Sequence, residues 1–235
     1  MQRIAAHATE LAYEFIGDGE PTIVIVPQWF LSSRSMRAGA LVRKLAELHR
    51  VLLYDRRGTG ASDKPGPPYT TARDSRDLGA LTEALGLDGI VVVGMGVRGS
   101  HVGLHFAGHF PSRVRAIVCI GGTPRWSAGP EWPYGLSDQA WGQAFGDLES
   151  RGDDEPPTGA SIAMREDWSA AGRQAALDIL THTRNEDLRP FLRKVTPPTL
   201  VVHLRGDALV PFEAARWLAE SLPNGTLEVF DAGRE

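Results

Sequence analysis

The segment "GMGVRGS", residues 94–100, places glycines, an arginine and a serine between an apolar stretch and a predicted helix. A strand followed by a glycine-rich turn and a helix is an arrangement that can present a serine nucleophile. The only hydroxyl in the segment belongs to Ser100, which we expect in the first helical turn, where serine commonly satisfies a backbone N–H group. Arg98 is a candidate for binding a carboxylate at the helix N-terminus, although an exposed arginine is usually solvated.

The same segment also spells G-x-G-x-x-G with Gly94, Gly96 and Gly99, a pattern typical of dinucleotide binding. The preceding strand lies centrally in the chain, and no acidic residue ends a strand about 20 residues later. We therefore expect no nucleotide and no other cofactor.

Three histidines, His101, His105 and His109, follow at intervals of four residues along one edge of the predicted helix. Two histidines at this spacing can hold a metal ion. A third ligand eight residues away would lie about 12 Å along the helix axis, beyond the reach of one ion. The sequence therefore predicts no metal site here.

The composition restricts the class of protein. The chain has 235 residues, of which 42% are hydrophobic, and a formal net charge of -4. These values predict a globular protein with a large core and no general affinity for nucleic acid. The single cysteine, Cys119, permits no disulfide within the chain, and no segment has the length and apolarity of a signal or membrane span. We expect a cytoplasmic protein without a membrane partner.

Six short apolar stretches punctuated by turn residues predict strands at residues 22–27, 50–55, 89–94, 115–122, 198–204 and 226–231. Their continuous hydrophobicity favours parallel strands covered on both faces, and helical patterns alternate with them. The prediction is an α/β protein with a mostly parallel, doubly wound sheet. Residues 1–122 and 195–235 would form the core, with "ELAYEF" as an antiparallel edge strand, and residues 123–194 a helical cap.

Three segments, "VLLYDRRGTGASDKP", "HFAGHFPSRVRAIVCIGG" and "PTLVVHLRGDALVPFEAARWLAESLPN", resemble the α/β-hydrolase fold superfamily, and in order and spacing the resemblance covers nearly the whole chain. More narrowly, "VPQWF", "YDRRGTGASD" and "EWPYGLSDQAW" are similar to hydrolase-type domains that some bacterial proteins carry beside nucleotide-cyclase or transcription-regulator domains. The resemblance implies an α/β-hydrolase fold and a catalytic serine, histidine and acid.

This chain departs from that triad. The place of the nucleophile falls on Gly96 or Val97, neither of which can attack a substrate. Where the family carries its histidine, this chain has Arg234. Whether a histidine beyond Glu235 takes that role is left open by the sequence. Asp207 falls at the acid position, where we expect it to accept backbone hydrogen bonds, with retained catalytic use as the alternative.

The predicted cap would form the roof of a ligand pocket at the carboxyl ends of the strands, and its aromatic residues predict a partly apolar small molecule. Each tryptophan of the cap could equally anchor that segment to the core. The residues expected to contact the ligand are Gln28, Trp29, Gly96, Val97, Arg98, Trp126, Trp132 and Trp141.

Three functions remain open from the sequence. The first is non-hydrolytic chemistry, such as cyclisation, isomerisation, elimination or decarboxylation, in a pocket without a covalent intermediate. The second is a pseudoenzyme that binds a ligand or a protein partner. The third is an esterase-like hydrolase with unconventional residues, for which Asp207 and Ser100 are the catalytic candidates. Assembly into a homo-oligomer is also left open.

Overall fold

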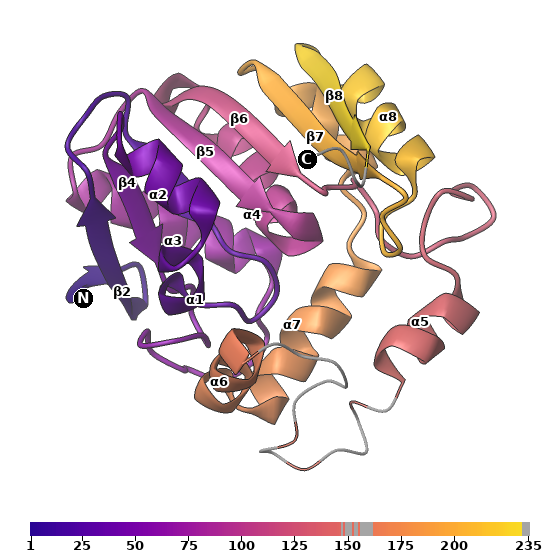
Figure 1. Ribbon diagram of the computed structural model, residues 1–235, viewed down its shortest axis with the longest axis horizontal. Helices are drawn as coiled ribbons and strands as arrows, with labels where there is room; N and C mark the ends of the chain where they lie inside the picture. The colour runs from indigo at the N-terminus through magenta and orange to yellow at the C-terminus, as the bar shows by residue number, and fades with distance from the viewer. Residues whose placement is uncertain (147, 149–151, 153–154, 156–161, 232–235) are drawn as a thin grey trace.

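The computed structural model describes residues 1–146, 148, 152, 155 and 162–231 (Figure 1). Within these residues, one sheet of eight strands forms the centre of the molecule. The strands are β1 (Gln2–Ala6), β2 (Thr9–Ile16), β3 (Ile23–Val26), β4 (Val51–Tyr54), β5 (Ile90–Met95), β6 (Val114–Ile120), β7 (Thr199–Arg205) and β8 (Gly225–Asp231).

The spatial order of the strands is β1-β2-β4-β3-β5-β6-β7-β8. β2 runs antiparallel to both β1 and β4, and the remaining neighbours are parallel. The predicted mostly parallel sheet is confirmed. The expected edge position of "ELAYEF" is wrong, because this segment forms part of β2 and β1 lies outside it.

Helices connect the parallel strands, as right-handed crossovers require. They are α1 (Ser33–Arg37), α2 (Ala40–Ala46), α3 (Thr71–Ala84), α4 (Gly96–His109), α5 (Asp138–Phe145), α6 (Ile162–Ala171), α7 (Arg173–Asn185) and α8 (Phe212–Ser221), with short 3-10 turns at Pro111–Arg113 and Arg189–Lys194. None of the described helices is long and apolar enough to cross a membrane.

Two apolar layers hold the helices against the sheet. On one face, side chains of α3, α4 and α8, such as Leu78, Phe106 and Leu218, share a buried cluster with the strands. On the other face, Val42 of α2 packs with residues of β3 and β4. Figure 1 shows α2 in front of the sheet, with α3 and α4 behind it. The central strand β3 is buried throughout, which its continuous run of Ile and Val predicts.

β7 departs from the expectation that both faces are covered. Its residues alternate between buried Val201 and exposed Leu200, and Leu204 is 46% exposed. Period-two exposure is typical of a strand with only one covered face. The continuous apolar sequence of this strand therefore overestimates its burial.

The chain between β6 and β7 carries α5, α6 and α7. Figure 1 shows these helices together on the side of the molecule toward which β5 and β6 point. Their aromatic and aliphatic side chains join Trp29 and Phe30 in a second buried cluster. The division of the chain into a core and a cap at residues 123–194 stays a prediction.

Candidate active-site pocket

The glycine-rich segment forms the junction between β5 and α4. β5 ends at Met95 and α4 begins at Gly96, whose φ of +60° lies in the left-handed region. A residue with a side chain would be strained there, so glycine suits the position. Of the two residues considered for the nucleophile's place, Gly96 is therefore the one at the apex of the turn.

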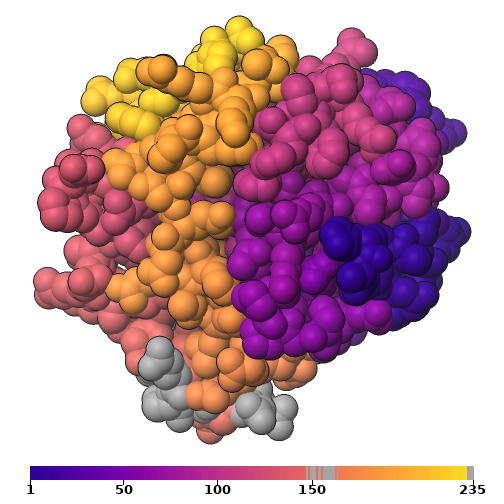
Figure 2. Space-filling view, turned by 180° about the vertical axis from the view of Figure 1, so that it is seen from behind, coloured from indigo at the N-terminus to yellow at the C-terminus, as the bar shows by residue number. Residues whose placement is uncertain are grey.

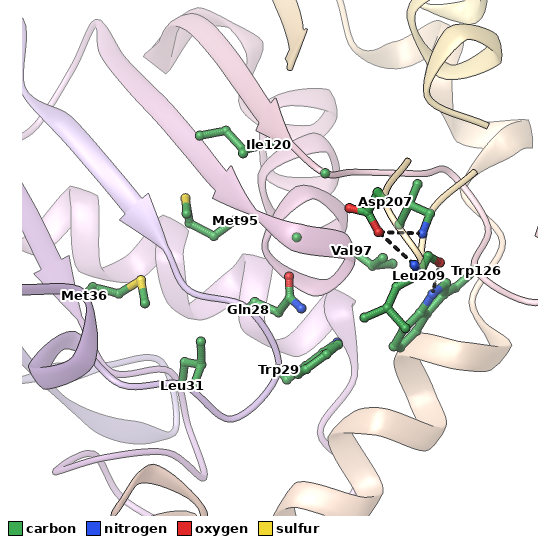
Figure 3. A pocket seen from close by; sticks show the side chains of 13 residues that line it. Gln28, Trp29, Leu31, Met36, Met95, Val97, Ile120, Trp126, Asp207 and Leu209 are labelled. Carbon is green, nitrogen blue, oxygen red and sulfur yellow. Dashed lines mark hydrogen bonds between the residues drawn. The ribbon is translucent and has the colours of Figure 1, made fainter. Parts of the chain in front are cut away.

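The carboxamide of Gln28 occupies the space beside Gly96. A Cβ atom added to Gly96 would lie 1.0 Å from Gln28 Oε1 and 2.1 Å from Cδ. Figure 3 shows this carboxamide pointing toward the end of β5. Gln28 thus fills the volume that any side chain at position 96 would need.

These residues border a cavity of about 330 Å³ at the carboxyl ends of the strands (Figure 3). Open α/β sheets place ligands at this edge. The predicted residues that line it are Gln28, Trp29, Gly96, Val97, Trp126 and Asp207. Sequence reasoning missed the apolar and glycine positions Leu31, Met36, Met95, Ile120, Gly121, Leu209 and Val210.

The two carboxylate oxygens of Asp207 have different surroundings. Oδ1 accepts hydrogen bonds from the backbone N–H groups of Leu209 at 2.8 Å and Val210 at 3.0 Å. Oδ2 faces Gly121, since a Cβ atom added there would lie 3.8 Å from it. The predicted acceptance of backbone hydrogen bonds is confirmed, and both of these hydrogen bonds go to Oδ1.

Trp29 forms one wall of the pocket. Its ring stacks on that of Trp126, with centroids 5.8 Å apart and planes 20° from parallel. Its backbone has a φ of +42°, and its carbonyl accepts a hydrogen bond from Arg56 Nη2. The buried indole Nε1 of Trp29 has no hydrogen-bond partner among the described residues.

The three tryptophans after β6 that were predicted to contact the ligand lie in three different places. Trp126 lines the pocket and donates from Nε1 to the Leu209 carbonyl at 3.0 Å. Trp132 is buried elsewhere, with its ring edge-on to Trp217, and does not line the pocket. Trp141 packs edge-on against Trp126 and borders a separate cavity of about 130 Å³. Only Trp126 of these three is therefore at the pocket.

The expectation that the Arg98 guanidinium points into the pocket mouth or into solvent is wrong. Arg98 is fully buried and does not line the pocket. Its Nη2 donates to Asp74 Oδ2 at 2.8 Å and to the Tyr69 carbonyl at 2.7 Å, and its Nη1 donates to Thr71 Oγ1 at 3.0 Å. Paired in this way, a buried guanidinium is tolerated, and no part of it faces the ligand cavity.

Asp74 receives a second guanidinium, because Arg56 Nη1 donates to the same Oδ2 at 2.8 Å. Burial acts to raise the pKa of Asp74, but the charges of Arg98 and Arg56 outweigh it and hold the pKa below its usual value. Neither Arg56 nor Asp74 was singled out from the sequence. The only signal was the Arg56-Arg57 dipeptide after a strand, which does not reveal burial.

The Ser100 hydroxyl also lies away from the pocket lining. Ser100 is buried and its Oγ donates to the Gly94 carbonyl at 3.3 Å. The hydroxyl therefore does not cap a helix-start N–H group, which was the structural role expected of it. A Cβ atom added to Gly122 would lie 2.5 Å from this Oγ, so the hydroxyl fills the space between β5 and the turn after β6.

Close packing accounts for the spacing of the glycines. A Cβ atom added to Gly94 would lie 2.6 Å from the Gly99 carbonyl oxygen, and one added to Gly99 would lie 2.3 Å from the Val26 carbonyl oxygen. Both contacts are shorter than van der Waals packing allows, so α4 can approach the sheet only with glycine at both positions. Arg234, at the expected place of the histidine, lies outside the described residues.

Solved structures share this architecture. A bromoperoxidase from Bacillus anthracis superposes with a TM-score of 0.79 at 28% identity, over 98% of this chain and 91% of that one. The predicted fold class, an α/β-hydrolase fold with a mostly parallel sheet flanked by helices, is thereby confirmed.

Two relatives bear on the reaction. A pimeloyl-[acyl-carrier protein] methyl ester esterase of Aromatoleum aromaticum is 32% identical, with 90% of this chain and 89% of the esterase aligned. A putative carbamate hydrolase of Azorhizobium caulinodans is 27% identical, with 95% and 87% aligned. These names point to hydrolase-type activity, and they overturn the expectation of cyclisation, isomerisation, elimination or decarboxylation. That expectation rested on the absence of the family's serine and histidine from their expected positions.

The family model described as alpha/beta hydrolase fold matches residues 21–154, which is more than half of the chain. The match includes β3, β4, β5 and β6 and the junction at Gly96. The chain therefore belongs to the alpha/beta hydrolase fold family.

Proposed function

We propose that this protein hydrolyses a small, partly apolar ester by direct attack of water, without an acyl-enzyme. The observation that carries the proposal is the Gln28 carboxamide, which fills the space a side chain at Gly96 would occupy. An amide there can orient a water molecule by hydrogen bonding, whereas it cannot itself become a nucleophile. The esterase and carbamate hydrolase relatives support a carbonyl substrate.

Asp207 is the base in this proposal. Its Oδ1 is held by two backbone N–H groups, which leaves Oδ2 on the pocket side to accept a proton. Water attacks the carbonyl carbon and its proton passes to Oδ2. When the ester C–O bond breaks, Oδ2 returns that proton to the leaving alcohol. The acid product releases the second proton of the water to solvent and departs as the carboxylate.

The start of α4 supplies the electrostatic stabilisation. The first backbone N–H groups of a helix have no partner within the helix, and Gly96 and Val97 both line the cavity. N–H groups directed at a developing oxyanion lower the barrier to attack. The apolar walls, Trp29, Trp126 and Met36, suit a short acyl or aromatic group.

Hydrolysis of p-nitrophenyl acetate and butyrate tests the proposal. We expect Asp207→Asn to lower kcat by about 10²-fold or more, because it removes the base. We expect Gln28→Ala to lower it by about 10²-fold, because the water loses its orientation. The matched controls are Asp88→Asn and Gln174→Ala, two exposed positions outside the pocket, which should leave kcat unchanged.

Covalent chemistry provides the second readout. Direct attack by water predicts no burst of p-nitrophenol and no mass gain after treatment with an aryl fluorophosphonate. A stoichiometric burst or a phosphonylated residue would show a covalent nucleophile and overturn the proposal. Undiminished activity of Asp207→Asn would do the same.

Binding without turnover is the second candidate function. Its supporting observation is that the residues lining the described pocket include no serine, cysteine or histidine. This function fits the resemblance to hydrolase-type domains that stand beside nucleotide cyclases or regulators. It also fits the degenerate catalytic triad of this chain. A compound that co-purifies and binds tightly, with every ester tested left intact, would favour it over hydrolysis.

We also propose a cytoplasmic location. The supporting observation is Cys119, the single cysteine of the sequence, which is fully buried in β6 and unpaired. Fractionation of the source cells with cytoplasmic and periplasmic markers tests this location. Recovery with the periplasmic marker would overturn it.

A further inference from the structure

A second cavity, of about 340 Å³, lies outside the pocket described above. It is formed by the turn between β1 and β2, the loop after β4, and α3. Its lining residues are His7, Ala8, Arg57, Pro65, Arg73 and Arg76. Figure 2 shows the N-terminal segment, in indigo, beside the purple segment that contains these arginines. None of the six residues lines the first pocket.

The charges around this cavity are unbalanced. Arg57 forms a bidentate ion pair with buried Asp77, through Nε at 2.5 Å and Nη2 at 2.6 Å. Among the described residues, the Arg73 guanidinium donates to one group, the neutral Pro68 carbonyl, at 3.0 Å. The Arg76 side chain, on α3, forms no ion pair and no hydrogen bond within the described part of the chain. Two arginine charges therefore lack a counterion among the residues that the structure describes, in a chain whose formal net charge is -4.

We propose that this cavity binds a small organic phosphate, such as a phosphate monoester. A phosphate carries a charge of about -1.5 to -2 at neutral pH, which matches the two uncompensated guanidinium groups. Arginine pairs with phosphate oxygens through two parallel N–H donors, and three arginines from two segments border this one cavity.

An organic group on the phosphate accounts for the rest of the cavity. Arg73 and Arg76 supply the charge, while Ala8 and Pro65 provide an apolar part of the lining. Exposed arginines are usually solvated, but here their side chains converge on one concavity together with His7 at the tip of the β1–β2 turn. A phosphate monoester uses both parts of the lining, whereas inorganic phosphate uses only the charged part.

Isothermal titration of the full chain with phenyl phosphate, inorganic phosphate and phenol tests the proposal. We expect phenyl phosphate to bind more tightly than inorganic phosphate, and phenol not to bind. Arg73→Gln and Arg76→Gln should each weaken phenyl phosphate binding about tenfold or more, because each removes a charge-assisted hydrogen bond. Arg193→Gln, at an exposed position outside the cavity, is the matched control and should bind as the parent does.

Each outcome of these titrations tests a different part of the proposal. Unchanged affinity in both cavity variants, or a heat signal that sodium sulfate at equal ionic strength reproduces, would overturn the site. Equal affinity for phenyl phosphate and inorganic phosphate would overturn the organic phosphate assignment. Because Arg76 is exposed, its substitution should leave the far-UV circular dichroism and Tm unchanged, and a change in either would make Arg73→Gln the deciding variant. Ester hydrolysis in the first pocket is independent of all these results.

Discussion

Arg98 and Asp74 form an ion pair inside the molecule, with Nη2 and Oδ2 2.8 Å apart and both side chains at most 1% exposed. Arg56 shares the same carboxylate oxygen and donates to the backbone carbonyl of Trp29. Asp74 thus connects the first turn of α4 to the wall of the pocket. The arrangement positions Trp29 through buried charges, although none of these charged groups lines the pocket.

Replacing Asp74 by asparagine should destabilise the fold strongly. The change leaves the guanidinium groups of Arg56 and Arg98 buried without their shared carboxylate, and removing one partner of a buried ion pair costs about 3–5 kcal/mol. Urea unfolding followed by circular dichroism measures this loss. Asp88→Asn, whose side chain is 80% exposed, is the control and should change stability by less than about 0.5 kcal/mol. A loss below about 1 kcal/mol for Asp74→Asn would contradict the role assigned to the pair.

The sequence predicted the strands well because each parallel strand is a short apolar run bounded by turn residues. The stretch predicted at residues 89–94, for example, lies within one residue of β5 (Ile90–Met95) at both ends. β1, a short and mostly exposed strand, was missed because its apolar residues, Ile4, Ala5 and Ala6, form too short a run and show no clear alternation.

The site was only partly predictable for a related reason. Gln28, Gly96 and Asp207 lie within two residues of the ends of β3, β5 and β7, so the fold alone brings them to one edge of the sheet. The position of Arg98 depends instead on Asp74, which is 24 residues away and on a different helix. No local pattern reveals such a pairing, and an arginine is by default expected at the surface.

The fit between Gln28 and Gly96 is measurable as a coupling energy. Gly96→Ala should lower the free energy of unfolding by about 1–2 kcal/mol, because alanine is strained in the left-handed backbone conformation of position 96. A further loss follows because the added Cβ displaces the Gln28 carboxamide. Gly86→Ala is the matched control, since Gly86 has a φ of +63° and no atom within 4 Å of an added Cβ. In the Gln28→Ala background we expect the cost of Gly96→Ala to fall by about 0.5–3 kcal/mol, toward that of the control. Equal costs in both backgrounds would show that the carboxamide does not occupy this space.

Ser100→Ala distinguishes packing from chemistry. The Ser100 hydroxyl donates to the Gly94 carbonyl, so its removal should lower the free energy of unfolding by about 1 kcal/mol. Because the hydroxyl does not line the pocket, kcat for p-nitrophenyl butyrate should stay at the parental value. Stability comes from urea unfolding and kcat from initial rates of the same preparation. A 10²-fold fall in kcat with unchanged stability would instead return Ser100 to the list of catalytic groups.

Acid should weaken the fold partly through His105. Burial and the neighbouring His109 lower the pKa of His105 from 6.5 to about 4 in the folded protein. Between these two values the unfolded chain binds the proton more strongly, so stability falls as the pH drops from about 6.5 to 4. His105→Phe keeps an aromatic ring against Phe191, whose ring lies 5.0 Å from that of His105, and removes the titration. Its loss of stability between pH 7 and pH 5 should be smaller than the parent's by about 1–2 kcal/mol.

Burial also lowers the pKa of His101 and His203, so both act in the same direction and some pH dependence should persist in His105→Phe. Urea unfolding at pH 7, 6 and 5 measures the slope for each variant. Gln174→Ala, at an exposed position without a titratable side chain, is the control and should keep the parental slope. If stability depends on pH equally in His105→Phe and in the parent, then the stacked rings of His105 and His109 are accessible to protons in the folded protein. Acid would then destabilise the protein through other groups.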